Sequence, residues 1–90
     1  AAPSGTFQTG EGLLNIAANK QQQFVALAKL IERPDLVTDE RFADREERKR
    51  NRLALKDEIE KALAADSAEN WAAKMNALGV PAGFARLRAG

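Results

Sequence analysis

Apolar residues recur at two different spacings along this chain, and the change of spacing separates expected strands from expected helices. Near the start, two short runs over residues 6–8 and 13–18 flank a turn that contains Gly10 and Gly12. In the second run Leu14 and Ile16 share one face, while the other face is mixed, as in a strand with one buried side. The sequence therefore predicts a β-hairpin, which must pack on other elements because two strands alone are marginally stable in water.

A helical spacing follows the hairpin. The apolar positions recur at i, i+3, i+4 and i+7, and they are Phe24, Leu27, Ala28 and Ile31. This stripe predicts a helix over residues 21–32. Asn19 is the expected N-cap, because its side-chain oxygen can accept from a free backbone N–H. Pro34 is expected to end the helix, since the residue before a proline avoids the α region.

The next segment predicts a connector and one long helix. Over residues 35–44 we expect a connector whose core-facing side chains are Leu36, Val37 and Phe42. The helix is predicted over residues 44–66. Its first half has no apolar residue, and its second half has an apolar stripe formed by Leu55, Ile59, Ala62 and Leu63. This helix should therefore start exposed and become buried towards its end.

The final third of the sequence predicts a third helix and a third strand. Ser67 is an N-cap candidate, and Gly79 fits the position just beyond the helix, with Pro81 shortly after. The expected inner stripe is Trp71, Met75 and Leu78. A strand from about residue 83, within 80–87, completes an α+β domain over residues 1–90, in which a β-hairpin and a third antiparallel strand pack with three helices. If that strand pairs with the hairpin, we expect the two chain ends to lie close together, as an inserted domain requires.

The composition is that of an ordinary soluble domain. Of the 90 residues, 44% are hydrophobic and 30% charged, and the net charge is +1. These values argue against a disordered chain and against nucleic-acid binding driven by overall charge. No apolar run approaches the roughly 18 residues of a membrane span, and the start lacks the basic end and apolar stretch of a signal peptide. We therefore expect a cytoplasmic protein without membrane contact. The first residue is Ala rather than Met, which suggests a piece of a longer chain or a processed chain.

Two missing residue types narrow the chemistry. The chain has no Cys and no His. It therefore has no thiolate nucleophile or thiolate metal site, and it lacks the commonest general base and nitrogen ligand. We expect no metal site, no cofactor bound by this segment and no self-contained active site.

Two features could still bind an anion. The first is a basic run over residues 45–52, formed by Arg45, Arg48, Lys49, Arg50 and Arg52. It fits either an RNA-binding face or a solvated helix surface with the i,i+4 pairs Asp44–Arg48 and Glu46–Arg50. The solvated surface is favoured because no aromatic residue is interleaved to stack on bases.

The second feature is Asn19-Lys20, where the second strand meets the first helix. The start of a helix offers free N–H groups and a positive dipole end, which suit an anion or a carbonyl oxygen. Lys20 would add a charge. The alternative is a plain cap beside a solvated lysine. By contrast, the glycines at residues 10 and 12 form a hairpin turn rather than a phosphate-binding loop, because they join two strands.

A series of short motifs runs over residues 3–84. They are Phe7-Gln8-Thr9-Gly10-Glu11-Gly12, Leu14-Asn15-Ile16-Ala17-Ala18-Asn19, Gln23-Phe24 with Leu27, Arg33-Pro34-Asp35-Leu36, Asp39-Glu40-Arg41-Phe42-Ala43, Asn51-Arg52, Trp71 and Gly79-Val80-Pro81-Ala82-Gly83. In this order they resemble CoA-transferase family III, also called the CaiB/BaiF family. Two positions depart from the family pattern: Glu11 stands where Asp is usual, and Glu40 where Pro is frequent. Both lie in turns or loops.

The resemblance implies the small domain of an enzyme that moves CoA between carboxylic acids. In that family an aspartate of the large domain forms a mixed anhydride and an aspartyl-CoA thioester. That aspartate and a glycine-rich loop would lie outside this segment, so the segment alone should be inactive. The implied partners are the large domain of the same chain, acyl-CoA, and a second subunit in an interlocked homodimer. The family also includes acyl-CoA racemases, which remain an alternative.

The resemblance and the predicted topology together suggest a substrate-facing surface. We expect the hairpin exit and the return into the third strand to lie nearest the substrate: Ala18, Asn19, Lys20, Pro81, Ala82 and Gly83. The rival hypothesis from another class is a stand-alone helical interaction or RNA-binding module that uses the basic run over residues 45–52.

Overall fold

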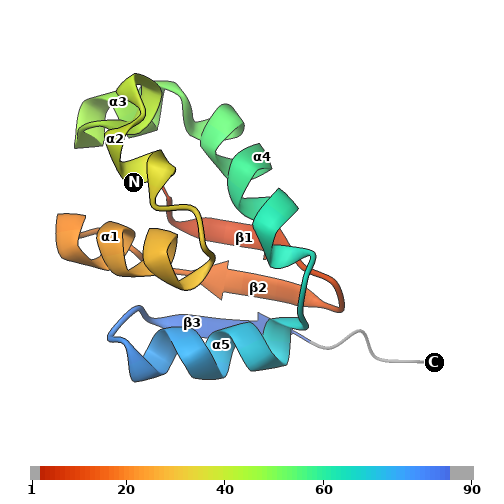
Figure 1. Ribbon diagram of the computed structural model, residues 1–90. Coiled ribbons are helices and arrows are strands. Elements are labelled where there is room, and N and C mark those ends of the chain that lie inside the picture. The colour runs from red at the N-terminus through yellow and green to blue at the C-terminus, as the bar shows by residue number, and fades with distance from the viewer. Residues whose placement is uncertain (1–2, 86–90) are drawn as a thin grey trace.

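A three-stranded antiparallel sheet organises the domain (Figure 1), and the computed structural model describes residues 3–85. The strands are β1 (Gly5–Gln8), β2 (Leu13–Ile16) and β3 (Ala82–Ala85), in the order β1-β2-β3. The predicted hairpin and the antiparallel third strand are both confirmed. The strand begins one residue earlier than expected, and the expected strand positions 86–87 lie outside the described residues.

Helices and short turns cover the sheet. They are α1 (Gln21–Leu30), α2 (Asp35–Thr38), the 3₁₀ turn η1 (Glu40–Phe42), α3 (Arg45–Arg50), α4 (Arg52–Leu63) and α5 (Ala68–Ala77). In Figure 1, α5 runs beside β3 and α4 beside β1, while α2 and α3 gather at the end of the domain away from β3. The α+β class is confirmed, with more and shorter helices than the three predicted.

The core lies between one face of the sheet and the helices. Leu14 and Ile16 are buried while their neighbours Leu13 and Asn15 are exposed, which confirms the predicted alternation. The side chains with no exposed surface are Leu14, Phe24, Leu27, Ala28, Phe42, Leu55, Ile59, Leu63, Met75 and Val80. Most of the predicted stripe residues are among them. The indole Nε1 of Trp71 donates to the Leu63 carbonyl at 2.9 Å, so α4 and α5 are joined by a polar contact as well as by packing.

The long helix predicted over residues 44–66 is wrong, because the chain breaks it at Asn51. Asn51 adopts φ −105° and ψ 31° between α3 and α4. Its side-chain amide donates to the carbonyls of Arg41 and Glu47, both at 3.0 Å. An asparagine that bonds nearby backbone groups competes with the helical ladder. The amide therefore connects the end of α3 to Arg41, which lies in η1 before α3. The helical ladder stops at Asn51, and α4 starts as a separate helix.

The expectation that the first half of that helix is wholly exposed is also wrong. Arg48 is only 3% exposed, and its guanidinium carbon lies 4.6 Å from the centre of the Phe24 ring. Its Nη1 donates to the Phe42 carbonyl at 3.2 Å, and its Nε has no partner among the described residues. Burial lowers the pKa of the Arg48 guanidinium. The predicted ion pairs Asp44–Arg48 and Glu46–Arg50 do not form among the described residues, and Arg50 pairs with Glu47 instead.

Three details at helix ends also differ from the predictions. Lys20, not Asn19, occupies the N-cap of α1. The helix ends at Leu30, earlier than predicted, because Glu32 turns the chain with a φ of 61°. Leu78 is 52% exposed rather than buried, because α5 stops at Ala77 and Val80 takes the inner position. The region expected as a plain connector contains α2 and η1. Leu36 and Phe42 in it are buried as predicted, and Val37 is half-buried.

Two local predictions at α5 are confirmed. Ser67 is its N-cap, and the hydroxyl accepts from the Asn70 N–H at 3.1 Å. Gly79 follows the helix with a φ of 80°, the left-handed conformation that ends many helices. Together these residues set where α5 starts and where the chain leaves for β3.

The expectation that the chain ends lie close together concerns residues outside the described range 3–85. In the sheet register Gly5 pairs with Ile16, which pairs with Ala82. At the other end Gln8 pairs with Leu13, which pairs with Ala85. β1 and β3 therefore run in the same direction, with β2 between them. The start of β1 and the end of β3 lie at opposite ends of the sheet.

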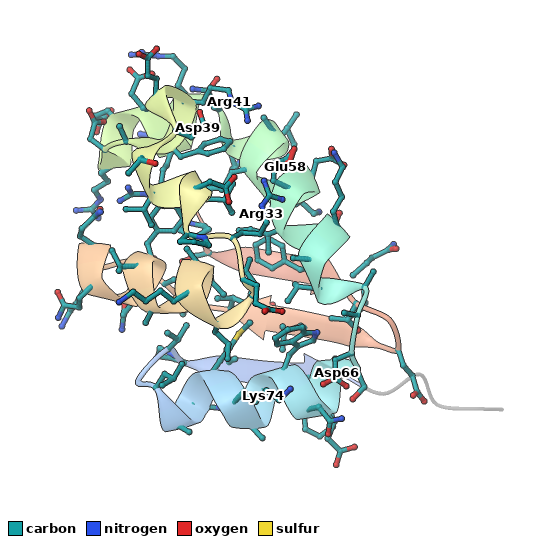
Figure 2. The ribbon with its side chains drawn as sticks, in the orientation of Figure 1. Arg33, Asp39, Arg41, Glu58, Asp66 and Lys74 are labelled. Carbon is teal, nitrogen blue, oxygen red and sulfur yellow. The ribbon has the colours of Figure 1, made fainter. Side chains whose placement is uncertain are left out.

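An ion pair between the end of α1 and α4 predicts acid sensitivity. Arg33 Nη2 lies 3.1 Å from Glu58 Oε1, and Figure 2 shows the two side chains pointing toward one another. The hydrogen bond from Arg33, and then that from Lys61, lowers the pKa of Glu58 below its usual range. A lowered folded-state pKa contributes stability that is complete above the ordinary value and is lost as pH falls through the folded value. We expect the free energy of unfolding to decrease as pH falls below about 4.5.

The Glu58→Gln variant isolates this contribution. Because glutamine does not titrate, the gap in unfolding free energy between the variant and the parent chain should narrow as pH falls from 6 to 3. Urea unfolding at each pH measures that gap. A gap that stays constant over this range would show that the Arg33–Glu58 pair does not contribute to acid sensitivity.

Candidate functional site

The two segments predicted to face the substrate lie side by side at one end of the sheet. The Ala17 N–H donates to the Pro81 carbonyl at 2.9 Å, just beyond the pair formed by Ile16 and Ala82. Gly83 pairs with Asn15 one step further along. The Ala17–Pro81 contact places residues 18–20 and residues 81–83 near the same end of the sheet, although they are about sixty positions apart in the sequence. We refer to these six residues together as the candidate surface.

The predicted site residues differ in exposure. Ala18 is 2% exposed and belongs to the core, so only its backbone is close to this surface. Asn19 and Lys20 are exposed, as are Pro81 and Gly83, and Ala82 is half-buried. The side-chain oxygen of Asn19 accepts from the hydroxyl of Ser4 rather than from α1. The surface thus presents one amide and one ammonium group beside backbone atoms.

The start of α1 keeps the electrostatic character that the sequence suggested. Lys20 is the N-cap, with extended backbone at φ −101° and ψ 149°, and its side chain makes no capping hydrogen bond. The Lys20 N–H donates to Gln23 Oε1 at 3.0 Å, and no acidic residue stands in the first turn. The positive end of the helix dipole is therefore not neutralised by α1 itself, which suits a carboxylate or a carbonyl oxygen.

Two supporting residues were missed by the sequence analysis. Asn76 on α5 accepts from the Ala82 N–H at 3.0 Å and donates to the Ala82 carbonyl at 2.8 Å. Gln23 Nε2 donates to the Gly79 carbonyl at 3.3 Å. A glutamine three residues after a helix N-cap is a known capping signal and could have indicated Gln23. Nothing in the local sequence indicates Asn76, because its partner lies on a separate strand.

Removing the Asn76 side chain should loosen the start of β3. Asn76 also donates to the Ala72 carbonyl at 2.9 Å, so the Asn76→Ala variant loses three hydrogen bonds. Each bond contributes about 1 kcal/mol, but water replaces part of it at this exposed position. We therefore expect the free energy of unfolding to fall by about 2 kcal/mol. Hydrogen exchange at the Ala82 amide should accelerate with it. An exposed helical control, Ala73→Ser, should change neither quantity appreciably; an unchanged Ala82 exchange rate in Asn76→Ala would contradict the prediction.

The ionisable side chain of this surface is the ammonium group of Lys20, and the surface includes no acidic side chain. None of its six residues lines the cavities of about 480 Å³ and 230 Å³ elsewhere in the domain. Over residues 3–85 there is no group of three or more acidic side chains that could hold a metal ion. No helix in this range is long and apolar enough to cross a membrane.

The basic run over residues 45–52 does not form one continuous face. Arg48 is buried against Phe24, and Arg50 pairs with Glu47. Arg52 belongs to the next helix, beyond the break at Asn51. These contacts weaken the RNA-binding hypothesis, which depended on several cations projecting together.

Comparison with known proteins identifies relatives along almost the whole chain. A family model described as CoA-transferase family III matches residues 1–89. The probable fatty acyl-CoA transferase Rv3272 of Mycobacterium tuberculosis (strain ATCC 25618 / H37Rv) is 40% identical over 80 residues, which are 89% of this chain and 20% of that protein. The acetyl-CoA:oxalate CoA-transferase of Acetobacter aceti is 37% identical over 82 residues, which are 91% of this chain and 21% of that protein.

Solved structures show the same fold. The crystal structure of Rv3272 in its orthorhombic form has a TM-score of 0.91 at 38% identity and covers 96% of this chain and 24% of that one. A CAIB/BAIF family protein from Brucella suis has a TM-score of 0.88 at 34% identity and covers 91% of this chain and 22% of that one. The chain therefore spans between a fifth and a quarter of the length of these relatives.

Proposed function

Because the chain belongs to CoA-transferase family III, we propose that it is the small domain of a larger enzyme that transfers CoA between carboxylic acids. The observation that carries the proposal is the family match over residues 1–89, supported by two relatives named as CoA-transferases. The chain covers 20–21% of those two proteins, which leaves room for a large catalytic domain in the parent enzyme.

The nucleophile in this proposal is an aspartate of the large domain. Its carboxylate would attack the acyl-CoA thioester and expel CoA thiolate, which leaves a mixed anhydride. The thiolate would then attack the aspartyl carbonyl of that anhydride, releasing the donor carboxylate and forming an aspartyl-CoA thioester, so that one difficult transfer is divided into easier steps. Two acids of this segment, Glu58 and Asp66, form ion pairs within the domain instead. Glu58 pairs with Arg33, and Asp66 pairs with Lys74 at 3.1 Å. Hydrogen bonds, first from Asn70, lower the pKa of Asp66. The segment by itself is therefore proposed to be inactive.

The role of this domain is to help close the acyl end of the active site. The start of α1 with Lys20 provides a positive end for a carboxylate of the acyl group, and the Asn19 amide lies beside it. The Pro81–Gly83 return forms the adjoining wall, while the CoA nucleotide would bind mainly to the large domain. The parent enzyme is proposed to be cytoplasmic and to act as an interlocked homodimer.

Assays on the full-length parent enzyme test the reaction. We expect CoA to move from an acyl-CoA donor to a free carboxylic acid, and the 90-residue chain alone to catalyse no transfer. Epimerisation of an enantiopure acyl-CoA without any acceptor acid, in the absence of transfer, would support a racemase instead. A full-length protein that catalyses neither reaction would contradict the proposal.

Two substitutions test the predicted site. In the full-length enzyme, Asn19→Ala and Pro81→Ala are expected to raise the acceptor KM roughly tenfold, the effect of losing about 1.4 kcal/mol of binding. Asn70→Ala is the matched control, because Asn70 is an exposed asparagine on α5 outside this surface. Steady-state kinetics with varied acceptor acid measure the effect. Unchanged kinetics in both variants would remove these residues from the site.

A further inference from the structure

The beginning of α4 borders a cavity with a basic rim. This cavity of about 230 Å³ lies between residues 3–7 and the first turns of α4. Arg52, Leu53 and Lys56 line it on the helix side, and no acidic residue lines it. The candidate site described above does not use any of these three side chains.

Within α4, Lys56 has one acidic residue a helical turn away, Glu60, and Arg52 has none. Neither Arg52 nor Lys56 forms an ion pair within residues 3–85. Within α4 the charged residue one helical turn from Arg52 is Lys56, another cation. Glu60, one turn after Lys56, accepts instead from the Gln8 N–H at 2.7 Å. The first turn of α4 contains no acidic residue, so the cations also add to the positive end of that helix.

An exposed apolar side chain lies between these cations. Leu53 is 75% exposed, compared with 39% for Leu13, 52% for Leu78 and 42% for Phe84, the other large apolar residues at the described surface. A small anion would neutralise Arg52 and Lys56 but would leave Leu53 in water. The combination therefore favours a protein surface that brings a carboxylate and an apolar group together.

We propose that Arg52, Leu53 and Lys56 form a docking surface for the large domain of the same polypeptide. The matching patch should carry at least one Asp or Glu beside an apolar side chain. This inference rests on the proposed function, because it needs a parent chain longer than the segment. Chain of sufficient length is expected there, since the segment covers only 20–24% of the relatives.

The docking surface is connected to the candidate site. Ser4 lines the same cavity, and its hydroxyl donates to the side-chain oxygen of Asn19. A large domain seated on the cavity would therefore hold the segment before β1 in place. It would also hold the Asn19 amide in its present orientation at the start of α1.

Zero-length carbodiimide cross-linking of the full-length protein tests this proposal. The reagent joins a lysine amine only to a carboxylate in direct contact. We expect mass spectrometry to find Lys56 joined to an Asp or Glu outside residues 1–90 of the same chain. Lys56→Arg should abolish that cross-link while keeping the charge, and exposed Lys29 should form no such cross-link.

Three outcomes would overturn the proposal. They are coupling of Lys56 only to acids within residues 1–90, no coupling at all, or coupling only between subunits in mixed isotopically labelled dimers. As a second measurement, the double variant Arg52→Glu/Lys56→Glu should lower the Tm of the full-length protein by about 2 °C or more, and Lys29→Glu should not. An unchanged Tm in the double variant would count against docking. CoA transfer is assayed separately, so docking without transfer contradicts only the proposed activity, and transfer without the cross-link contradicts only docking.

Discussion

Replacing Gly10 with alanine is expected to lower the free energy of unfolding by about 3 kcal/mol, although Gly10 lies in an exposed turn. A Cβ at this position would lie 2.6 Å from the Ala64 carbonyl oxygen and 2.9 Å from the Asp66 carbonyl oxygen. Both are backbone atoms at the connection between α4 and α5, and they cannot rotate away as a flexible side chain would. The same turn is anchored there by the Gly10 N–H, which donates to the Asp66 carbonyl at 2.9 Å. To admit the methyl group, the hairpin must move away from this connection.

Chemical denaturation of the 90-residue protein measures the loss. The matched control is Gly83→Ala, because a Cβ at Gly83 meets nothing within 4 Å. That substitution should be neutral or slightly stabilising, since alanine restricts the unfolded chain more than glycine does. Equal stabilities of Gly10→Ala and Gly83→Ala would contradict the contact argument.

Replacing Phe24 with alanine should cost about 4 kcal/mol, a large part of the 5–15 kcal/mol typical of a small domain. Phe24 on α1 has no exposed surface, so its loss leaves a cavity in the core. The Arg48 guanidinium would also lose its contact with the Phe24 ring, whose centre lies 4.6 Å from the guanidinium carbon. A buried cation without an acidic partner depends strongly on such contacts. Loss of cooperative thermal unfolding is the simplest readout.

Milder variants keep this prediction testable if Phe24→Ala does not fold. Phe24→Leu keeps most of the apolar volume but removes the ring under Arg48, and we expect it to cost about 1–2 kcal/mol. In an Arg48→Met background the same change should cost less, because there is no cation to lose its partner. Leu53→Ala, at a side chain that is 75% exposed, is the neutral control in the 90-residue protein. Identical costs of Phe24→Leu in the two backgrounds would rule out the contribution of the cation.

Elements whose residues interact over short sequence distances were predictable. The alternation at Leu14 and Ile16 predicted β2, and the stripe through Phe24 and Leu27 predicted α1. The hydroxyl of Ser67 predicted the start of α5, because a cap bonds only to backbone a few residues away. In each case the stabilising contacts can be read within one helical turn or one strand.

The features that were mispredicted depend on contacts between distant segments. Arg48 looked like part of a solvated run, but Phe24 and the Phe42 carbonyl draw it inward. The break at Asn51 depends partly on the Arg41 carbonyl, ten residues earlier. The candidate site also combines features that the local sequence predicts with features that depend on distant contacts. The antiparallel pairing of β2 and β3 could be expected from the sequence, whereas the bonds of Asn76 to Ala82 join a helix to a strand and could not. The role of these residues in substrate binding stays a prediction.

The hydrogen bonds made by Asn76 and Glu60 also bear on self-association. β1 and β3 are the outer strands, and an outer strand with free N–H and C=O groups is a template for aggregation. Asn76 occupies both backbone groups of Ala82 on β3, and Glu60 occupies the N–H of Gln8 on β1. Each bond removes a point at which a strand from another molecule could join the sheet.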